Sequence, residues 1–202
     1  PYYKNMKFKI YIIAFFVLFL LSACVKQENY LIENINFDNY KAVNIDASDL
    51  IIDQLYISNI EYPYIDHLVK QNLISLINNW AGARLKPLEA NNSGVLKVVI
   101  NIASIKAFSL NKNTKIEDIF ISNAAINIEM NLDITINLLD ENGNKISYLD
   151  LKVFKSQELG DNISLLEKDY IIQEMTKSLI KDFDSLAITK LKEVFYKSLL
   201  PN

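Results

Sequence analysis

Residues 126–138 read INIEMNLDITINL, and this stretch decides the fold. Every second residue is apolar, beginning with Ile126 and ending with Leu138, and the residues between them are Asn, Glu, Asp or Thr. Successive side chains of a β-strand point to opposite faces of a sheet. The alternation therefore predicts a long strand with one buried face and one solvated face, as in an antiparallel sheet.

The segments on either side of this strand predict its neighbours in the sheet. Residues 140–143 read DENG, and an Asn-Gly pair between two strands is typical of a tight hairpin turn. The return strand is predicted from Leu149, Leu151 and Val153 with Phe154. An earlier strand is predicted within residues 95–108, where one face carries Leu96, Val98, Ile100 and Ile102.

Two short apolar runs predict further strands before the first helix. Residues 41–46 (KAVNID) and 49–57 (DLIIDQLYI) read as one bent strand or as two successive strands. A Tyr-Pro-Tyr turn follows at residues 62–64. The helix is predicted over residues 65–85, it stops before Pro87, and its apolar face carries Leu73, Ile77, Trp80, Ala81 and Leu85.

A long helix is predicted at the C-terminal end. Ser164 and Glu167 have the spacing of a capping box, in which the two side chains satisfy backbone N–H groups of the first turn. About 35 residues would span roughly 50 Å, so we expect either a kink or a projecting end. The apolar stripe is predicted to follow Ile172, Met175, Leu179, Phe183, Leu186, Lys190, Val194 and Ser198.

These elements together predict the fold class. A two-stranded ribbon is marginally stable by itself, so the apolar face of the hairpin must be covered. The two predicted helices supply that cover. The sequence therefore predicts an α+β fold, a mostly antiparallel sheet covered on one face by two helices, of which the C-terminal helix is long.

The N-terminal residues have the pattern of a secretory signal. From Met6 onward, Lys7 and Lys9 precede an apolar run over residues 10–21. As a helix, 12 residues would cover about 18 Å of a hydrocarbon core of roughly 30 Å. A cleaved signal over residues 1–23 is therefore favoured over a permanent membrane span, and residues 1–5 are expected to lie upstream of the true start.

The end of this signal resembles the lipobox of bacterial lipoproteins, with Leu21, Ser22 and Ala23 directly before Cys24. The resemblance implies cleavage between Ala23 and Cys24, a thioether-linked diacylglycerol on Cys24 and an acylated new amine, with palmitate-like chains holding the protein on a membrane. Lipidation also accounts for the single cysteine of an exported chain. An Asp after Cys24 would resemble the inner-membrane retention signal of Gram-negative lipoproteins, but Val25 stands there. The resemblance therefore implies the periplasmic face of the outer membrane over the inner membrane.

The remaining chain is predicted to be a tether followed by one domain. Residues 24–40 are polar and lack periodicity, so they are expected to be the lipidated N-terminus and tether, and residues 41–202 a single α+β domain. Loss of the three lysines within residues 1–23 leaves 18 basic and 24 acidic groups, a net charge of −6. With Arg84 as the only arginine, no basic stripe exists for nucleic acid, and glycine is too scarce for nucleotide-binding loops.

Few residues of the sequence are candidates for catalysis or for metal binding. His67 is the single histidine, with Asp66 beside it as a possible orienting group, and an exposed histidine near a helix start explains it more simply. Glu129 and Asp133 share the polar face of the long strand, where solvation accounts for them. We therefore expect no enzyme activity, no cofactor and no metal.

Three residues are candidate contacts for a partner or ligand. Trp80 and Arg84 lie four apart on one helix face, close enough for a stacked cation–π pair. Arg84 could bind a carboxylate or a lipid head group, or it could lie over a core tryptophan. Phe120, within residues 116–121 (IEDIFI), belongs either to a partner-binding edge or to a lid on the core.

The order of elements is similar to that of a group of small Gram-negative envelope lipoproteins. The matches are Trp80, Arg84 and Leu85 on the first helix, Phe120, and the stretch from Ser164 to Asp182. More distantly the layout looks like the auxiliary lipoproteins of lipid-transport ABC systems and the lipopolysaccharide-assembly lipoprotein. The resemblance implies a location in the cell envelope and a fold, but it implies no activity.

Two functions are expected from these observations. The first is a structural or adaptor role, in which the long terminal helix or the uncovered sheet face of a lipid-anchored protein docks another envelope protein. The alternative is a carrier that holds a lipid or other amphiphile between the helices and the sheet, as an auxiliary subunit of envelope lipid transport.

Overall fold

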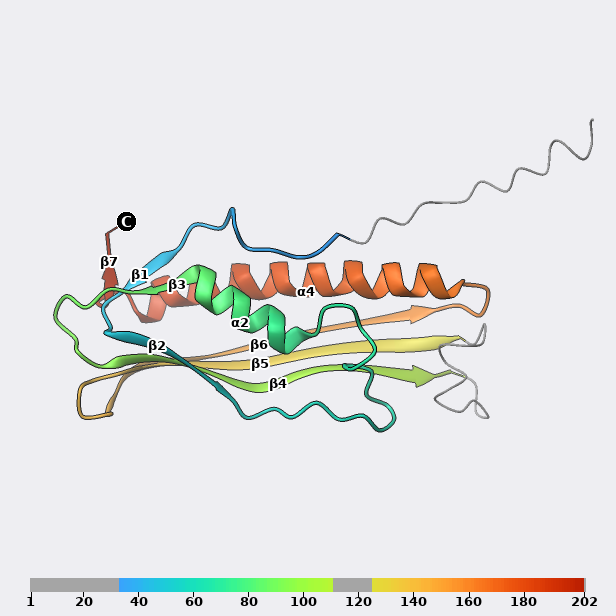
Figure 1. The fold of residues 1–202 in the computed structure, drawn as a ribbon, viewed down its shortest axis with the longest axis horizontal. Helices are drawn as coiled ribbons and strands as arrows, with labels where there is room; N and C mark the ends of the chain where they lie inside the picture. The colour runs from blue at the N-terminus through green and yellow to red at the C-terminus, as the bar shows by residue number, and fades with distance from the viewer. Residues whose placement is uncertain (1–32, 111–124, 202) are drawn as a thin grey trace, which may run out of the picture. The chain divides into compact units, whose positions relative to one another are not determined.

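The computed structural model describes residues 33–110 and 125–201, and the α+β class is confirmed there (Figure 1). The signal, Cys24 and Phe120 lie outside the described residues. The elements in chain order are β1 (Val43–Ile45), β2 (Asp49–Gln54), α2 (Leu73–Arg84), β3 (Leu85–Pro87), β4 (Val95–Ser109), β5 (Ile126–Leu139), β6 (Lys145–Leu159), α4 (Leu165–Val194) and β7 (Leu199–Leu200).

The larger sheet has the strand order β2-β4-β5-β6. The long strands β4, β5 and β6 are antiparallel neighbours, whereas the short β2 runs parallel to β4. The predicted alternation of β5 is confirmed, because all seven apolar side chains from Ile126 to Leu138 are fully buried. The predicted hairpin is confirmed as well, with Gly143 at a φ of 80° in its turn.

One feature of β4 differs from the sequence prediction. Ile100 pairs with Ile134 and Ile102 pairs with Asp133, so Asn101 is an extra residue that forms a β-bulge. Past the bulge the strand changes face, and the buried apolar side chains become Ala103, Ile105 and Ala107. The prediction that Ile102 shares the buried face of Ile100 was therefore wrong.

The first helix is shorter than predicted. Asn72 caps α2 by accepting a hydrogen bond from the backbone N–H of Ser75 at 2.8 Å, so the helix begins at Leu73 and not near residue 65. The preceding residues are tied to β4 instead, since the Ile65 N–H donates to the Ile105 carbonyl. At its other end α2 leads directly into β3, which was not predicted.

The long C-terminal helix is confirmed, but the second half of its apolar stripe was predicted wrongly. Ser164 accepts the N–H of Glu167 at 3.2 Å, as the capping prediction requires. After Phe183, however, the buried positions are Ala187, Leu191 and Phe195 and not the predicted Leu186, Lys190, Val194 and Ser198. The helix is one continuous element of 30 residues that runs straight in Figure 1, and residues 199–200 turn back beside β1.

A second, small sheet has the order β3-β1-β7 and was not predicted. The strands β1 and β3 are parallel, and β7 joins β1 on its other side in antiparallel pairing. Elements of two or three residues are too short to show an alternation, so neither β3 nor β7 has a sequence signal.

Part of the expected tether packs on the domain. Phe37 is only 4% exposed. The side chain of Gln71 bonds to both the N–H and the carbonyl of Ile35, and the side chain of Gln173 donates to the carbonyl of Glu33 at 3.0 Å. Residues 33–40 therefore lie against the helices, which leaves residues 25–32 as the sequence between Cys24 and the described fold.

Candidate functional site

The predicted contact residues Trp80 and Arg84 meet a partner from the other helix. Asp184 of α4 accepts hydrogen bonds from the Trp80 indole N–H at 2.8 Å and from Arg84 Nε at 2.7 Å, both on Oδ1. Arg84 Nη2 donates to the second carboxylate oxygen at 3.2 Å, and Nη1 donates to the backbone carbonyl of Lys41. The result is a bidentate ion pair that joins α2 and α4.

This cluster is part of the interior. Trp80 is fully buried and Arg84 is 7% exposed, so neither side chain is presented at the surface. The expected stacking of Arg84 on Trp80 was wrong: the guanidinium lies 5.3 Å from the ring centroid of Tyr40, and Trp80 packs edge-to-face on Phe183 at 4.7 Å. Asp184 was missed because its partners lie about 100 residues away in the chain.

A second buried acid, Asp46, holds the loop between β3 and β4. Its carboxylate accepts the backbone N–H groups of Ala90, Asn91 and Asn92 at 2.9 to 3.0 Å. Burial by itself raises the pKa of Asp46, but the hydrogen bonds from Asn91, Ala90 and Asn92 outweigh burial and lower the pKa below its usual value. This acid therefore has a structural role in fixing the loop.

A third buried acid, Asp66, lies behind the segment that follows β2. Its Oδ2 accepts the hydroxyl groups of Tyr56 at 2.6 Å and Ser58 at 3.0 Å, and its Oδ1 accepts the N–H of Ile105. Burial, the hydrogen bond to Asp66 and its negative charge all raise the pKa of Tyr56, which keeps the phenol protonated as a donor. The structure thus gives Asp66 partners other than its neighbour His67, whose side chain is exposed.

The acidic side chains on the outer face of the sheet form an ion pair and hydrogen bonds with side chains of adjacent strands. Asp133 forms an ion pair with Lys152 at 2.9 Å and accepts the side-chain amide of Asn101 at 3.2 Å. Thr135 donates to Asp150 at 2.7 Å. Within the described residues, no group of three or more His, Cys, Asp or Glu side chains is placed to hold a metal ion. The arrangement of Asp133 is that of a cross-strand network on a sheet surface.

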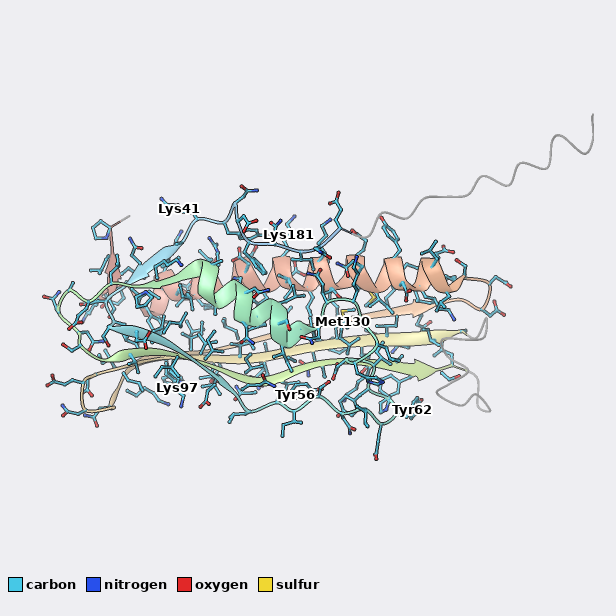
Figure 2. All side chains as sticks on the ribbon, in the orientation of Figure 1. Lys41, Tyr56, Tyr62, Lys97, Met130 and Lys181 are labelled. Carbon is cyan, nitrogen blue, oxygen red and sulfur yellow. The ribbon has the colours of Figure 1, made fainter. Side chains whose placement is uncertain are left out.

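Four exposed apolar side chains lie in one loop, which we call the apolar loop (residues 55–62). Two of them, Ile57 and Ile60, are the most exposed large apolar side chains of the described residues. The exposed fractions are 63% for Leu55, 82% for Ile57, 74% for Ile60 and 50% for Tyr62. Tyr56 and Tyr62 mark this loop in Figure 2, where it runs along the outer side of β4. The sequence predicted a strand over residues 49–57, so a loop that begins at Leu55 was not expected.

Backbone contacts hold the apolar loop at both ends. The N–H groups of Leu55 and Tyr56 both donate to the Ile100 carbonyl, at 3.1 and 3.0 Å. After the loop, the Pro63 carbonyl accepts the N–H of Ala107 at 2.9 Å. The two attachment points lie at the bulge and near the end of β4. Within the loop, the ring of Tyr62 also packs edge-to-face on Phe108 of β4, with the ring centroids 6.4 Å apart.

Two grooves border α4. One has a volume of about 500 Å³ and lies between β6 and the helix, where Lys155, Tyr170 and Met175 line it. The other has a volume of about 540 Å³ and lies between residues 33–40 and the helix, where Ile35, Lys177 and Lys181 line it. Both mix charged and apolar side chains, and they share Glu174 and Ser178.

Comparisons with known proteins add little to this geometry. No protein-family model matches the sequence, and no curated protein matches it. Among solved structures, the chain is similar to a minor lipoprotein from Acinetobacter baumannii, with 11% identity and a TM-score of 0.31 over 77% of this chain and 97% of that one. A score this low carries no argument about fold or function.

The described residues contain no helix that is long and apolar enough to cross a membrane. The expected lipidation and cleavage residues, Cys24 and Ala23, and the expected contact residue Phe120 lie outside the described ranges. Because Trp80 and Arg84 are buried and the apolar loop exposes four large apolar side chains, we take the apolar loop as the candidate functional site.

Proposed function

We propose that this protein is a lipid-anchored envelope protein that docks another protein through the apolar loop. Acyl chains on Cys24 hold the chain at the membrane, and the domain presents Ile57 and Ile60 to the partner. The observation that carries this proposal is the exposure of four large apolar side chains within eight residues. Exposed apolar side chains that cluster on a folded domain are typical of interaction sites.

Charge favours a protein partner over direct insertion of the apolar loop into a bilayer. The chain after Cys24 has a net charge of −6, which anionic lipid head groups repel. Within the loop, Ser58, Asn59 and Glu61 alternate with the apolar residues, and burying Glu61 in hydrocarbon would be unfavourable. A protein surface can instead cover the apolar side chains and leave the polar ones at a solvated rim.

The interior gives less support to the carrier alternative. A lipid held between the helices and the sheet would need space in that layer. Met130 of β5, Leu179 of α4 and Trp80 of α2 occupy it, and each is fully buried (Figure 2 labels Met130). Such density is typical of a packed protein core. We therefore place the proposed function at the surface and assign no catalytic step to it.

Site-specific cross-linking in intact cells tests the proposal. A photo-activated cross-linking amino acid at Ile57 is expected to give a discrete adduct with one other protein, because this side chain would be buried at the docking interface. The matched control is the same amino acid at Ile146, an isoleucine that is 49% exposed on β6. The cross-linked products are separated by mass and identified by mass spectrometry.

The two positions give outcomes that separate the possibilities. An adduct from position 57 that is absent from position 146 supports docking through the apolar loop. Labelling of lipid from position 57 would contradict the proposal in favour of membrane insertion. Equal, unspecific labelling from both positions would contradict docking at this loop.

A further inference from the structure

Some side chains of the apolar loop are held inward by hydrogen bonds, whereas others are exposed to solvent. Tyr56, Ile57 and Ser58 are consecutive, and the hydroxyl groups of the first and third both donate to Oδ2 of Asp66. Ile57 between them is 82% exposed, whereas Asp66 is 5% exposed. In an extended segment successive side chains point to opposite sides, so tying residues 56 and 58 inward turns residue 57 outward.

The carboxylate of Asp66 is itself fixed to the sheet. Its other oxygen, Oδ1, accepts the backbone N–H of Ile105 on β4. The acid therefore connects the middle of the loop to a long central strand, in addition to the attachments at Ile100 and Ala107. Hydrogen bonds to an ionised acceptor are stronger than those between neutral groups, which makes this connection well suited to hold a loop.

We propose that Asp66 is a positioning residue for docking, which holds Tyr56 and Ser58 inward so that Ile57 is presented to the partner. This inference rests on the proposed function of the apolar loop. Pre-organisation of a binding loop raises affinity because less conformational entropy is lost when the partner binds. A loop without these contacts would still contain Ile57 but would present it in many orientations.

The test removes the two hydroxyl groups and leaves Asp66 and its contact to β4 in place. In the full-length chain, the double variant Tyr56→Phe with Ser58→Ala is combined with the photo-cross-linker at position 57. We expect the yield of the partner adduct to fall about tenfold, the order of effect of losing charge-assisted hydrogen bonds. The control Ser58→Thr keeps a hydroxyl group and is expected to retain the yield of the parent chain.

A purely structural role is separated by two further measurements. Far-UV circular dichroism reports the thermal midpoint of the whole domain, and amide hydrogen exchange reports the opening of residues 57–60. The proposal expects faster exchange in this loop with unchanged exchange in β5. Loss of the adduct only in proportion to unfolded protein, or retention of the full yield, would overturn the positioning role.

The design also distinguishes this inference from the proposed function. If the parent chain gives no adduct from position 57, the proposed docking function is overturned, whatever the rate of amide hydrogen exchange in the loop. If the parent chain gives the adduct and the double variant exchanges amide hydrogens at the parent rate, the docking function stands and the role of Asp66 is overturned.

Discussion

Replacement of Asp184 by alanine is expected to lower the free energy of unfolding by about 3 to 5 kcal/mol, the range for breaking a buried ion pair. The carboxylate accepts Arg84 in a bidentate pair and the indole N–H of Trp80. Its removal leaves Arg84, a residue that is 7% exposed, without its counter-ion and leaves the indole N–H of Trp80 without its acceptor. Unpaired buried groups of this kind are strongly destabilising.

The chain provides its own reporter and control for this prediction. Trp80 is the single tryptophan, so denaturant unfolding followed by fluorescence reports the site directly. Asp182, two residues earlier, pairs with Lys155 at 2.7 Å with 54% of its side chain exposed, and Asp182→Ala is expected to change stability by less than about 1 kcal/mol. Equal stability of the two variants would contradict the assigned role of Asp184.

Replacement of Gly94 by alanine is expected to cost about 3 kcal/mol, the upper part of the range for overpacking. A Cβ atom at this position would collide with the carbonyl oxygen of Leu139 and lie 2.5 Å from the carbonyl carbon of Asp140. Both are backbone atoms, so no side-chain rotation relieves the collision. The start of β4 must then move away from the end of β5. Thermal unfolding should show a midpoint lower by roughly 6 to 12 °C.

A second glycine serves as the control for Gly94. Gly82 lies within α2, and a Cβ atom there would meet no atom within 4 Å. Because alanine is a better helix former than glycine, Gly82→Ala is expected to raise stability by about 0.5 to 1 kcal/mol. If both variants shifted the midpoint in the same direction, the explanation by close backbone approach would be wrong.

The sequence predicted the parts of the fold that have long periodic patterns. The alternation of β5 extends over 13 residues and located its seven fully buried apolar side chains, but it did not indicate that the polar Asn137 is buried as well. The stripe of α4 was correct up to Phe183 and then wrong, because the chain offers apolar residues at both Leu186 and Ala187 and only packing decides between them. The bulge at Asn101 was hidden for a similar reason, since Ile100 and Ile102 suit a single face until pairing with Asp133 is known.

The candidate site was less accessible to sequence reasoning. The spacing of Trp80 and Arg84 correctly places both on one helix face, but the acid that binds them comes from a different helix. Residues 55–57 of the apolar loop were predicted to end a strand, because apolar residues predict burial unless the pairing of their backbone is known. The proline at position 63 did predict a turn at residues 62–64, and the polar Ser58 and Asn59 are the signals that could have indicated a loop before it.

The packing of residues 33–40 on the domain limits how far the domain can lie from a membrane that holds Cys24. Glu33 is held against α4 by Gln173, so a tether from Cys24 to the folded domain consists of residues 25–32 and not of residues 25–40. Even a fully extended chain covers at most about 3.6 Å per residue, so an acylated Cys24 would keep Glu33 within roughly 30 Å of the membrane. The residues that pack beside Glu33, among them Gln173 of α4, would then be held near the same bilayer.

The most direct test of this account is membrane fractionation of the Cys24→Ser variant beside the parent chain in the same cells. If acyl chains on Cys24 hold the protein at the envelope, the parent chain sediments with membranes and gains the mass of the acyl groups, whereas the variant loses both properties. A variant that still sediments with membranes at the processed mass of the parent chain would contradict the central claim.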